Sequence, residues 1–380
     1  MNCLCAAEEK RDIISSIIPR RFIERRIRKD YDNPAGLLEA INLSGGKFGA
    51  SELISLRRGE TVKVPLSESF KDIYYSAAGN HKVRILNDEV MAGGSRLSSR
   101  YVPIAAGLAS GMEGLSKIVG MEEVKSVGIP QIAIIPRIDA QQYYLVGELE
   151  SRDEKCTAGT PYPTAFSTKK GITISVDLIG LGHSWMYSGI SHELVHFYRQ
   201  HRSNTPDMMI VEVDISGDKD IYRTGSINVI FEEVIAEFIG NSVALNGRFS
   251  DKHSIAMTNL IRLCRYLDGF EHKSMGRTIT PTEAGHFLGI YLYAGAVIDD
   301  AAYKKLIKDQ NGLRLIKPAG MKEFMGLFEN GDFDKGIRMS KELIGETASL
   351  ENLDKLCIAT VGMGFRSLLG SFDVSSISPV

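Results

Sequence analysis

The amino-acid sequence predicts an α+β fold, and three patterns indicate it. Residues 132–135, 144–149 and 171–179 are short runs rich in β-branched and other apolar residues, as strands are. Residues 186–200 and 231–240 repeat apolar side chains at helical spacing. The C-terminal third of the chain is mainly helical in pattern. These patterns favour a small sheet with helices beside it, followed by a helical C-terminal region.

The N-terminal region, residues 1–110, is expected to hold a basic helix and short strands at 61–64 and 82–86. The basic segment runs from Arg20 to Lys29 and places apolar side chains among its arginines. Such a helix can make weak contact with an anionic membrane, an acidic partner or a secretion chaperone, or it can pack its apolar stripe on the body of the protein. The role predicted for this region is targeting or substrate recruitment.

The rest of the chain is expected to divide into a core at residues 111–250 and a helical subdomain at residues 251–380. A helix start is indicated where Thr280 can act as the N-cap and Pro281 lies in the first turn. Helices are expected at 283–310, 320–346 and 351–369.

The segment 192–196 reads HELVH, which matches the HExxH motif. Because an α-helix turns once in about 3.6 residues, His192 and His196 project from one face and can bind one metal ion. Glu193 lies beside that face, where its carboxylate can take a proton from a metal-bound water. An HExxH on a helix is a zinc site with its own general base. We therefore predict Zn2+ as the cofactor, with His192 and His196 as ligands and Glu193 as the catalytic base.

A catalytic zinc needs a third protein ligand, and Glu233 is the best candidate. Glu237 follows it one turn later on the same helical face. Glu233 can then bind the metal while Glu237 accepts a ring N–H from a ligand histidine. Glu232 is the main rival as ligand, together with the acidic residues of a polar stretch before this helix. These are Asp207, Asp214, Asp218 and Asp220.

The HELVH helix followed by a Glu-Glu-x-x-Ala-Glu helix resembles the gluzincin metallopeptidases. The resemblance implies a zincin-like catalytic core, in which a small mixed sheet accompanies the HExxH helix and the helix of the glutamate ligand. Carried over to this chain, it makes His192, His196 and Glu233 the ligands. Residues 191–240 are also similar to the zinc metalloproteases that bacterial pathogens inject into host cells by type III secretion. That similarity implies a host signalling or cytoskeletal protein as the substrate.

Neighbouring residues refine this interpretation. The long metzincin motif is excluded, because Arg199 and Arg202 stand where it needs Gly and His. By resemblance to zincin peptidases, strand residues 172–178 form the edge of the cleft, to which an extended substrate adds as another strand. Residues 180–184 are expected to be a loop at the mouth of the site, where His183 is a loop residue rather than a ligand.

Amide hydrolysis also needs a donor for the negative charge that develops on the carbonyl oxygen. Tyr222, Arg223, Tyr198 and His286 have suitable side chains. Tyr222 is the first choice as this catalytic residue, because it lies in the segment that leads to Glu233. His286 is expected to be a buried structural histidine, because its segment is apolar.

Composition limits the class of protein. A net charge of −2 gives no general drive toward nucleic acid or membranes. No run of apolar residues reaches the ~18 of a membrane span, and the N-terminus lacks the order of a secretory signal. The five cysteines are odd in number and scattered, so no disulfide framework is implied. We expect synthesis in a bacterial cytoplasm, and any delivery into a host cytosol by a route without a cleavable signal.

These observations predict a zinc-dependent endopeptidase that cleaves a protein substrate with a metal-activated water, with a bacterial effector as the first expectation. Two alternatives stay open. One is a binding or scaffold protein whose zinc site is structural or degenerate. The other is a housekeeping metallopeptidase of the bacterium itself.

Overall fold

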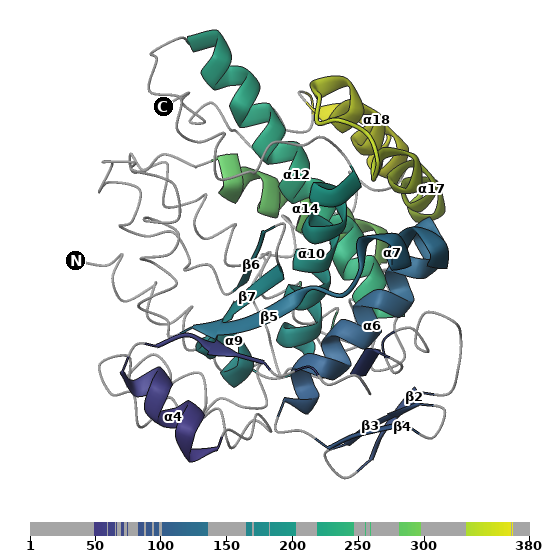
Figure 1. Ribbon diagram of the computed structural model, residues 1–380. Helices are drawn as coiled ribbons and strands as arrows, with labels where there is room; N and C mark the ends of the chain where they lie inside the picture. The colour runs from purple at the N-terminus through teal and green to yellow at the C-terminus, as the bar shows by residue number, and fades with distance from the viewer. Residues whose placement is uncertain are drawn as a thin grey trace, which may run out of the picture.

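The computed structural model shows an α+β fold, as the sequence predicts. Two small sheets and a set of packed helices make up the part of the chain that the structure describes (Figure 1). That part consists, apart from short gaps, of residues 49–135, 165–202, 219–246, 281–297 and 332–367, with the single residues 255 and 259.

Several predictions concern other parts of the chain. The basic segment 20–29 and the strand expected at 144–149 lie outside the described residues, as do Asp207, Asp214 and Asp218. The division into three regions stays a prediction. Within the described ranges, no helix has both the length and the apolar character that a membrane crossing requires.

Within the described residues, the larger sheet has four strands and is mixed. β5 and β7 are parallel, while β1 and β6 run antiparallel to their neighbours. The strand order is β1 (Val62–Lys63), β5 (Gln131–Ile135), β7 (Gly171–Ser175) and β6 (Ala165–Thr168).

One face of this sheet is apolar and supports the helix of the HELVH motif. Ile132 and Ile134 of β5 lie beside Ile172 and Ile174 of β7 in the parallel register, and all four side chains are buried. Because side chains along a strand alternate between faces, residues two apart share a side. Helix α10 (His183–Arg202) packs on β6 and β7, so the sheet is the floor on which α10 rests.

The structure corrects the strand expected at residues 171–179. β7 is followed directly by α9 (Val176–Leu181), so the second half of that segment is helical. Val176, Leu178 and Ile179 are all buried. The alternation of side chains along a strand would bury Val176 and Leu178 but not Ile179, whereas one helical turn can bury all three. The two-residue period of a strand was therefore the wrong interpretation beyond β7.

β7 is also not an edge strand, which contradicts its expected role in binding an extended substrate. It forms hydrogen bonds with β5 on one side and with β6 on the other, and a peptide can add only to an unpaired edge. Among the described strands, β1 and β6 lie at the edges of this sheet. The loop expected at residues 180–184 is likewise wrong, because α9 extends to Leu181 and His183 already begins α10.

The remaining N-terminal elements flank this core. β2 (Val83–Leu86), β3 (Glu89–Ala92) and β4 (Ser95–Ser98) form an antiparallel meander, the smaller of the two sheets. The short helices α4 (Ala50–Arg57) and α7 (Met121–Val127) pack against β1 and α6 respectively. β1 and β2 lie within two of the expected strands.

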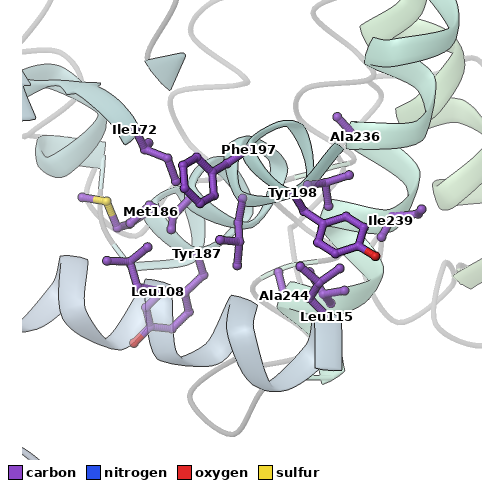
Figure 2. Close-up of a cluster of buried hydrophobic side chains, with 14 of the residues drawn as sticks. Leu108, Leu115, Ile172, Met186, Tyr187, Phe197, Tyr198, Ala236, Ile239 and Ala244 are labelled. Atoms are coloured by element: carbon purple, nitrogen blue, oxygen red, sulfur yellow. The ribbon is translucent and has the colours of Figure 1, made fainter. Parts of the chain in front are cut away.

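The hydrophobic core lies where α6 (Val102–Val119), α10 and α12 (Lys219–Asn246) pack together (Figure 2). Leu108 of α6 and Ile239 of α12 are fully buried there. α14 (Pro281–Val297) lies along α12 and starts where the Thr-Pro sequence predicts. Other members of this core drawn in Figure 2 are Leu115, Met186, Tyr187, Phe197, Tyr198, Ala236 and Ala244.

The C-terminal helices form a pair that packs on α12 and α14. α17 (Phe333–Leu343) and α18 (Leu350–Val361) contact each other, and both lie within expected helical segments, apart from the first residue of α18. Asp332 and Ser349 act as N-caps, each accepting a backbone N–H through its side chain. This pair sits beside the helices that carry the candidate site (Figure 1).

Candidate metal centre

Helix α10 presents the side chains of the HELVH motif as one buried group. The Nε2 atoms of His192 and His196 lie 3.1 Å apart, which confirms that one helical turn brings them together. α12 can approach this turn because Gly240 faces it. A Cβ atom on Gly240 would lie 2.7 Å from the Cα of His192, closer than any side chain allows. The sequence therefore brings α12 within ligand distance of α10.

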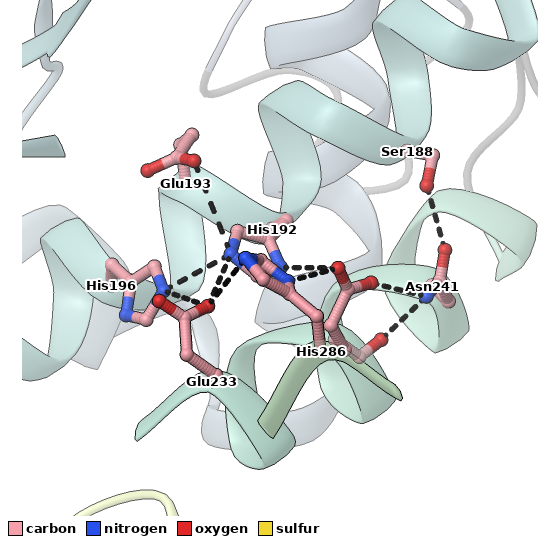
Figure 3. Close-up of polar contacts among 8 residues, drawn as sticks. Ser188, His192, Glu193, His196, Glu233, Asn241 and His286 are labelled. Carbon is pink, nitrogen blue, oxygen red and sulfur yellow. Dashed lines mark hydrogen bonds and ion pairs between the residues drawn. The ribbon is translucent and has the colours of Figure 1, made fainter. Parts of the chain in front are cut away.

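Glu233 of α12 completes a set of three donor atoms (Figure 3). Its Oε2 lies 3.3 Å from Nε2 of His192 and 3.5 Å from Nε2 of His196. Ligand atoms around a tetrahedral zinc, each ~2.0–2.1 Å from the metal, are themselves roughly 3.3 Å apart. Two imidazoles and a carboxylate are donors that zinc accepts. The arrangement thus fits a metal ion, and it offers three protein ligands, which leaves a position open.

The pKa values of His192 and Glu233 are shifted because the ionisable groups of this centre are buried and lie close together. Burial lowers the pKa of His192, but the charge of Glu237 and polar contacts with Glu233 and Glu237 outweigh it and raise the pKa to about 10. Burial would raise the pKa of Glu233, but the charge of His286 and hydrogen bonds from His192 and His196 hold it well below its usual range. The lowered pKa favours the carboxylate form of Glu233, which is the form that binds a metal.

Glu193 lies beside the donor set rather than in it. Its Oε1 is 3.9 Å from Nε2 of His192, and the residue is buried. Burial raises the pKa of its carboxyl group, and the nearby His192 and His196 offset part of that rise. A raised pKa makes the carboxylate a stronger proton acceptor. The position and the pKa both suit a general base.

Glu237 is fully buried and forms the polar layer behind His192. Its Oε1 lies 3.5 Å from Nδ1 of His192, and its Oε2 accepts a hydrogen bond from Nδ2 of Asn241 at 3.0 Å. Ser188 in turn donates to Oδ1 of Asn241 at 2.7 Å. A carboxylate on the far nitrogen fixes the orientation of a ligand histidine. Glu237 therefore lies behind His192, as the spacing predicts, but at 3.5 Å it is at ion-pair distance from Nδ1 and the predicted hydrogen bond is not formed in this structure.

His286 of α14 also lies in the centre, whereas the sequence offered it only as one of four possible donors and favoured a structural role for it. Its Nδ1 donates to Oε1 of Glu237 at 2.7 Å, its Nε2 lies 3.3 Å from Oε2 of Glu233, and its ring stacks on His192. It is therefore not a histidine buried in apolar packing. Gly285 was the available signal, because a Cβ there would lie 2.5 Å from the Cβ of Glu233. Only a glycine lets α14 come this close to α12.

Glu232, the rival third ligand, points away from the centre. Both of its carboxylate oxygens accept hydrogen bonds from Arg199, each at 2.7 Å. Arg199 is fully buried, and its remaining donors bind backbone carbonyl oxygens at the end of α17. A carboxylate held in this bidentate ion pair is not available to a metal. Glu233, and not Glu232, faces the two histidines.

The other candidates fall outside the centre or outside the described side chains. Tyr198 is buried in the core between α6, α10 and α12 (Figure 2). Tyr222, Arg223 and Asp220 belong to the first turns of α12, but their side chains lie outside the described residues. The same holds for the side chain of His183. The structure therefore brings His192, His196, Glu193, Glu233, Glu237 and His286 together.

Comparison of the chain with protein-family models, with curated proteins and with solved structures finds no match. Function has to be inferred from the chemistry of the centre and from the local resemblance of residues 191–240.

Proposed function

We propose that this protein is a zinc-dependent endopeptidase of the gluzincin type, with a zincin-like core. The observation that carries the proposal is the donor set itself: Nε2 of His192, Nε2 of His196 and Oε2 of Glu233 lie 3.1 to 3.5 Å apart in a buried site. Three protein ligands are typical of catalytic zinc, whereas structural zinc sites are closed by four. The donor set therefore favours hydrolysis over the scaffold alternative.

His192, His196 and Glu233 would hold the metal. When bound there, zinc lowers the pKa of a water and polarises a carbonyl group. Glu193 takes one proton from the attacking water and delivers it to the amine nitrogen as the peptide bond breaks. The protein then regains its starting state, because the proton that Glu193 accepts is the one it returns. Glu237 keeps His192 oriented during this cycle.

The substrate class follows from the motif rather than from the fold. Residues 191–240 carry the sequence similarity to injected bacterial metalloproteases, so we infer a host protein as the substrate and a host cell as the place of action. The basic segment 20–29 would then recruit a partner or a secretion chaperone. A housekeeping peptidase would use the same centre on a protein of the bacterium.

The experiment uses a peptide library prepared from a human cell proteome, with new N-termini identified by mass spectrometry. The wild-type protein loaded with zinc should produce specific cleavages, and Glu193→Gln should produce none while it keeps its zinc. Cleavage that persists in Glu193→Gln would exclude Glu193 as the base. Stoichiometric zinc without any cleavage, on this library and on a library from bacterial protein, would favour the scaffold alternative.

A further inference from the structure

The facing surfaces of α10 and α12 carry a polar pair at each of three successive turns. Along each helix these residues lie four positions apart, so they share one face of the helix. The pairs are His196 with Glu233, His192 with Glu237, and Ser188 with Asn241. The third pair therefore continues the polar surface of the metal centre by one turn, although neither of its residues is a candidate ligand (Figure 3).

The side-chain amide of Asn241 has one orientation that suits its neighbours. Its Nδ2 donates to Oε2 of Glu237 at 3.0 Å and to the backbone oxygen of Glu237 at 2.7 Å. Its Oδ1 accepts from the hydroxyl group of Ser188 at 2.7 Å. The reversed amide would place an oxygen against both acceptors of Glu237, and acceptors repel one another. Ser188 and Glu237 therefore fix the direction in which Asn241 donates.

Burial makes the hydrogen bond from Asn241 important to Glu237. Ser188 is 2% exposed, Asn241 is 1% exposed and Glu237 is completely buried. A buried carboxylate is tolerated where donors face its oxygens. Asn241 supplies such a donor to Oε2, so that Oε1 is the oxygen that faces Nδ1 of His192 and accepts from His286.

His192 requires an acceptor at this position. A histidine that binds a metal through Nε2 carries its remaining proton on Nδ1. Nδ1 of His192 is buried and makes no hydrogen bond within the described part of the chain, and Oε1 of Glu237 lies 3.5 Å from it. A small rotation of the Glu237 carboxylate would shorten or lengthen this distance. Asn241 limits that rotation, because it holds the other oxygen.

We propose that Asn241 is a positioning residue of the metal centre and that Ser188 sets the direction of its amide. Asn241 acts through Glu237, because it holds the carboxylate where Oε1 can accept the Nδ1 proton of His192. The proposal rests on the metal centre of the proposed function and adds a layer of residues beyond Glu237. Both residues lie outside the HELVH and Glu-Glu-x-x-Ala-Glu segments, one turn before His192 and one turn after Glu237.

The test measures the zinc dissociation constant of the full chain by competition with a coloured chelator. The first variant is Asn241→Leu, because leucine has the branched shape of asparagine without its polar atoms. The matched control is Asn259→Leu. Asn259 is also completely buried, and its Nδ2 also donates to the backbone oxygen four residues earlier, that of Ile255.

The second variant is Ser188→Ala, which removes the hydroxyl group that holds Oδ1 of Asn241. Its control is Ser242→Ala, because Ser242 is completely buried on α12 and donates to the backbone oxygen of Phe238. This pair of variants decides the test if Asn241→Leu does not fold.

A double-mutant cycle separates positioning from general support of the fold. Asn241→Leu is introduced into Glu237→Gln, and the zinc dissociation constants of the single and double variants are compared. If Asn241 acts through the carboxylate of Glu237, its loss has no further effect on zinc affinity once that carboxylate is gone.

We expect the zinc dissociation constant to rise roughly tenfold in Asn241→Leu and about threefold in Ser188→Ala, while both controls keep the wild-type value. Glu237→Gln and the double variant should bind zinc equally. Independent, multiplied effects in the double variant would overturn the proposal, and so would wild-type affinity in both Asn241→Leu and Ser188→Ala. A wild type that binds no zinc would contradict the metal centre itself.

Discussion

Arg199 and Glu232 form a two-pronged ion pair in which both partners are buried, and this pair joins the helices that hold the metal centre. Arg199 lies one turn after His196 on α10, and Glu232 precedes Glu233 on α12. The guanidinium group also donates to the carbonyl oxygens of Leu343, Ile344 and Glu346, where α17 ends and its carbonyl groups need partners. The C-terminal helices are therefore tied to the same two helices as the donor set.

Removing Arg199 should destabilise the protein strongly. In Arg199→Met the carboxylate of Glu232 and the carbonyl oxygens at the end of α17 lose their donors inside the protein, which costs about 3–5 kcal/mol of unfolding free energy. Urea unfolding followed by circular dichroism measures it. The control is Arg202→Met, because Arg202 pairs with Glu123 at the surface and such pairs contribute less than about 1 kcal/mol. Equal losses of unfolding free energy in both variants would show that the buried Arg199–Glu232 pair stabilises the protein no more than a surface pair does.

Glu237→Gln should weaken metal binding while leaving all three candidate ligands in place. The neutral amide no longer offers a carboxylate to Nδ1 of His192, so the ligand ring loses its fixed orientation, and affinity falls about 10–100-fold. Competition with a coloured chelator measures the zinc dissociation constant. Glu113→Gln is the matched control, since it changes another buried carboxyl group, one that pairs with Lys117 on α6. An unchanged zinc affinity in Glu237→Gln would remove Glu237 from the centre.

Gly285→Ala should push α14 away from α12. The added methyl group would lie 2.5 Å from the Cβ of Glu233 and 2.9 Å from the backbone oxygen of Ile230, so the helices must separate, at a cost of about 1–3 kcal/mol. Thermal unfolding measures the loss. Gly345→Ala is the control, because a Cβ on Gly345 meets no atom within 4 Å. If Gly285→Ala unfolds at the same temperature as the wild type, α14 does not pack as closely against α12 as the structure shows.

The contributions of His192 and Glu233 to the stability of the metal-free protein should both be largest at mildly acidic pH. Glu237 and Glu233 raise the pKa of His192 from 6.5 to about 10, so its contribution is full below pH 6.5 and is lost as the pH rises through 10. The pKa of Glu233 is lowered from 4.5, so its contribution is full above pH 4.5 and is lost as the pH falls. Both contributions are full between these two values.

Urea unfolding of the metal-free protein at pH 5.5 and 8.5 tests this window, with His192→Gln as the comparison. The wild type should lose more stability than His192→Gln on going to pH 8.5. Zinc has to displace the proton of His192, so the stabilisation that zinc provides should grow over the same range. A wild-type protein whose pH dependence equals that of His192→Gln would contradict the charge state inferred for this ring.

The motif residues were predictable because their chemistry is local. Spacing within one helix places His192 beside His196, and spacing within a second helix places Glu233 beside Glu237, so periodicity alone gives both pairs. The start of α14 at Pro281 was predictable for the same reason. These features depend on residues that are neighbours in the chain.

The strand interpretation beyond Ser175 and the loop expected at 180–184 were local errors of period. The other errors and omissions concern relationships between distant segments. His286 enters the centre because of close packing between α14 and α12, and Gly285 in its own helix permits a close approach without showing which helix lies there. Glu232 and Glu233 look equivalent in sequence, and only the partner Arg199 separates their roles. The position of β7 inside the sheet depends on β6, which pairs with it on the side expected to be open. Such tertiary contacts lie beyond what a periodic pattern can specify.

The most direct test of the central claim is the zinc content of Glu233→Ala and Glu232→Ala, measured by elemental mass spectrometry beside wild type and His192→Ala. The donor set predicts about one zinc per chain in the wild type, loss of zinc in Glu233→Ala and His192→Ala, and retention in Glu232→Ala, whose side chain binds Arg199 instead. Zinc retained by Glu233→Ala and lost by Glu232→Ala would contradict the centre that the structure shows.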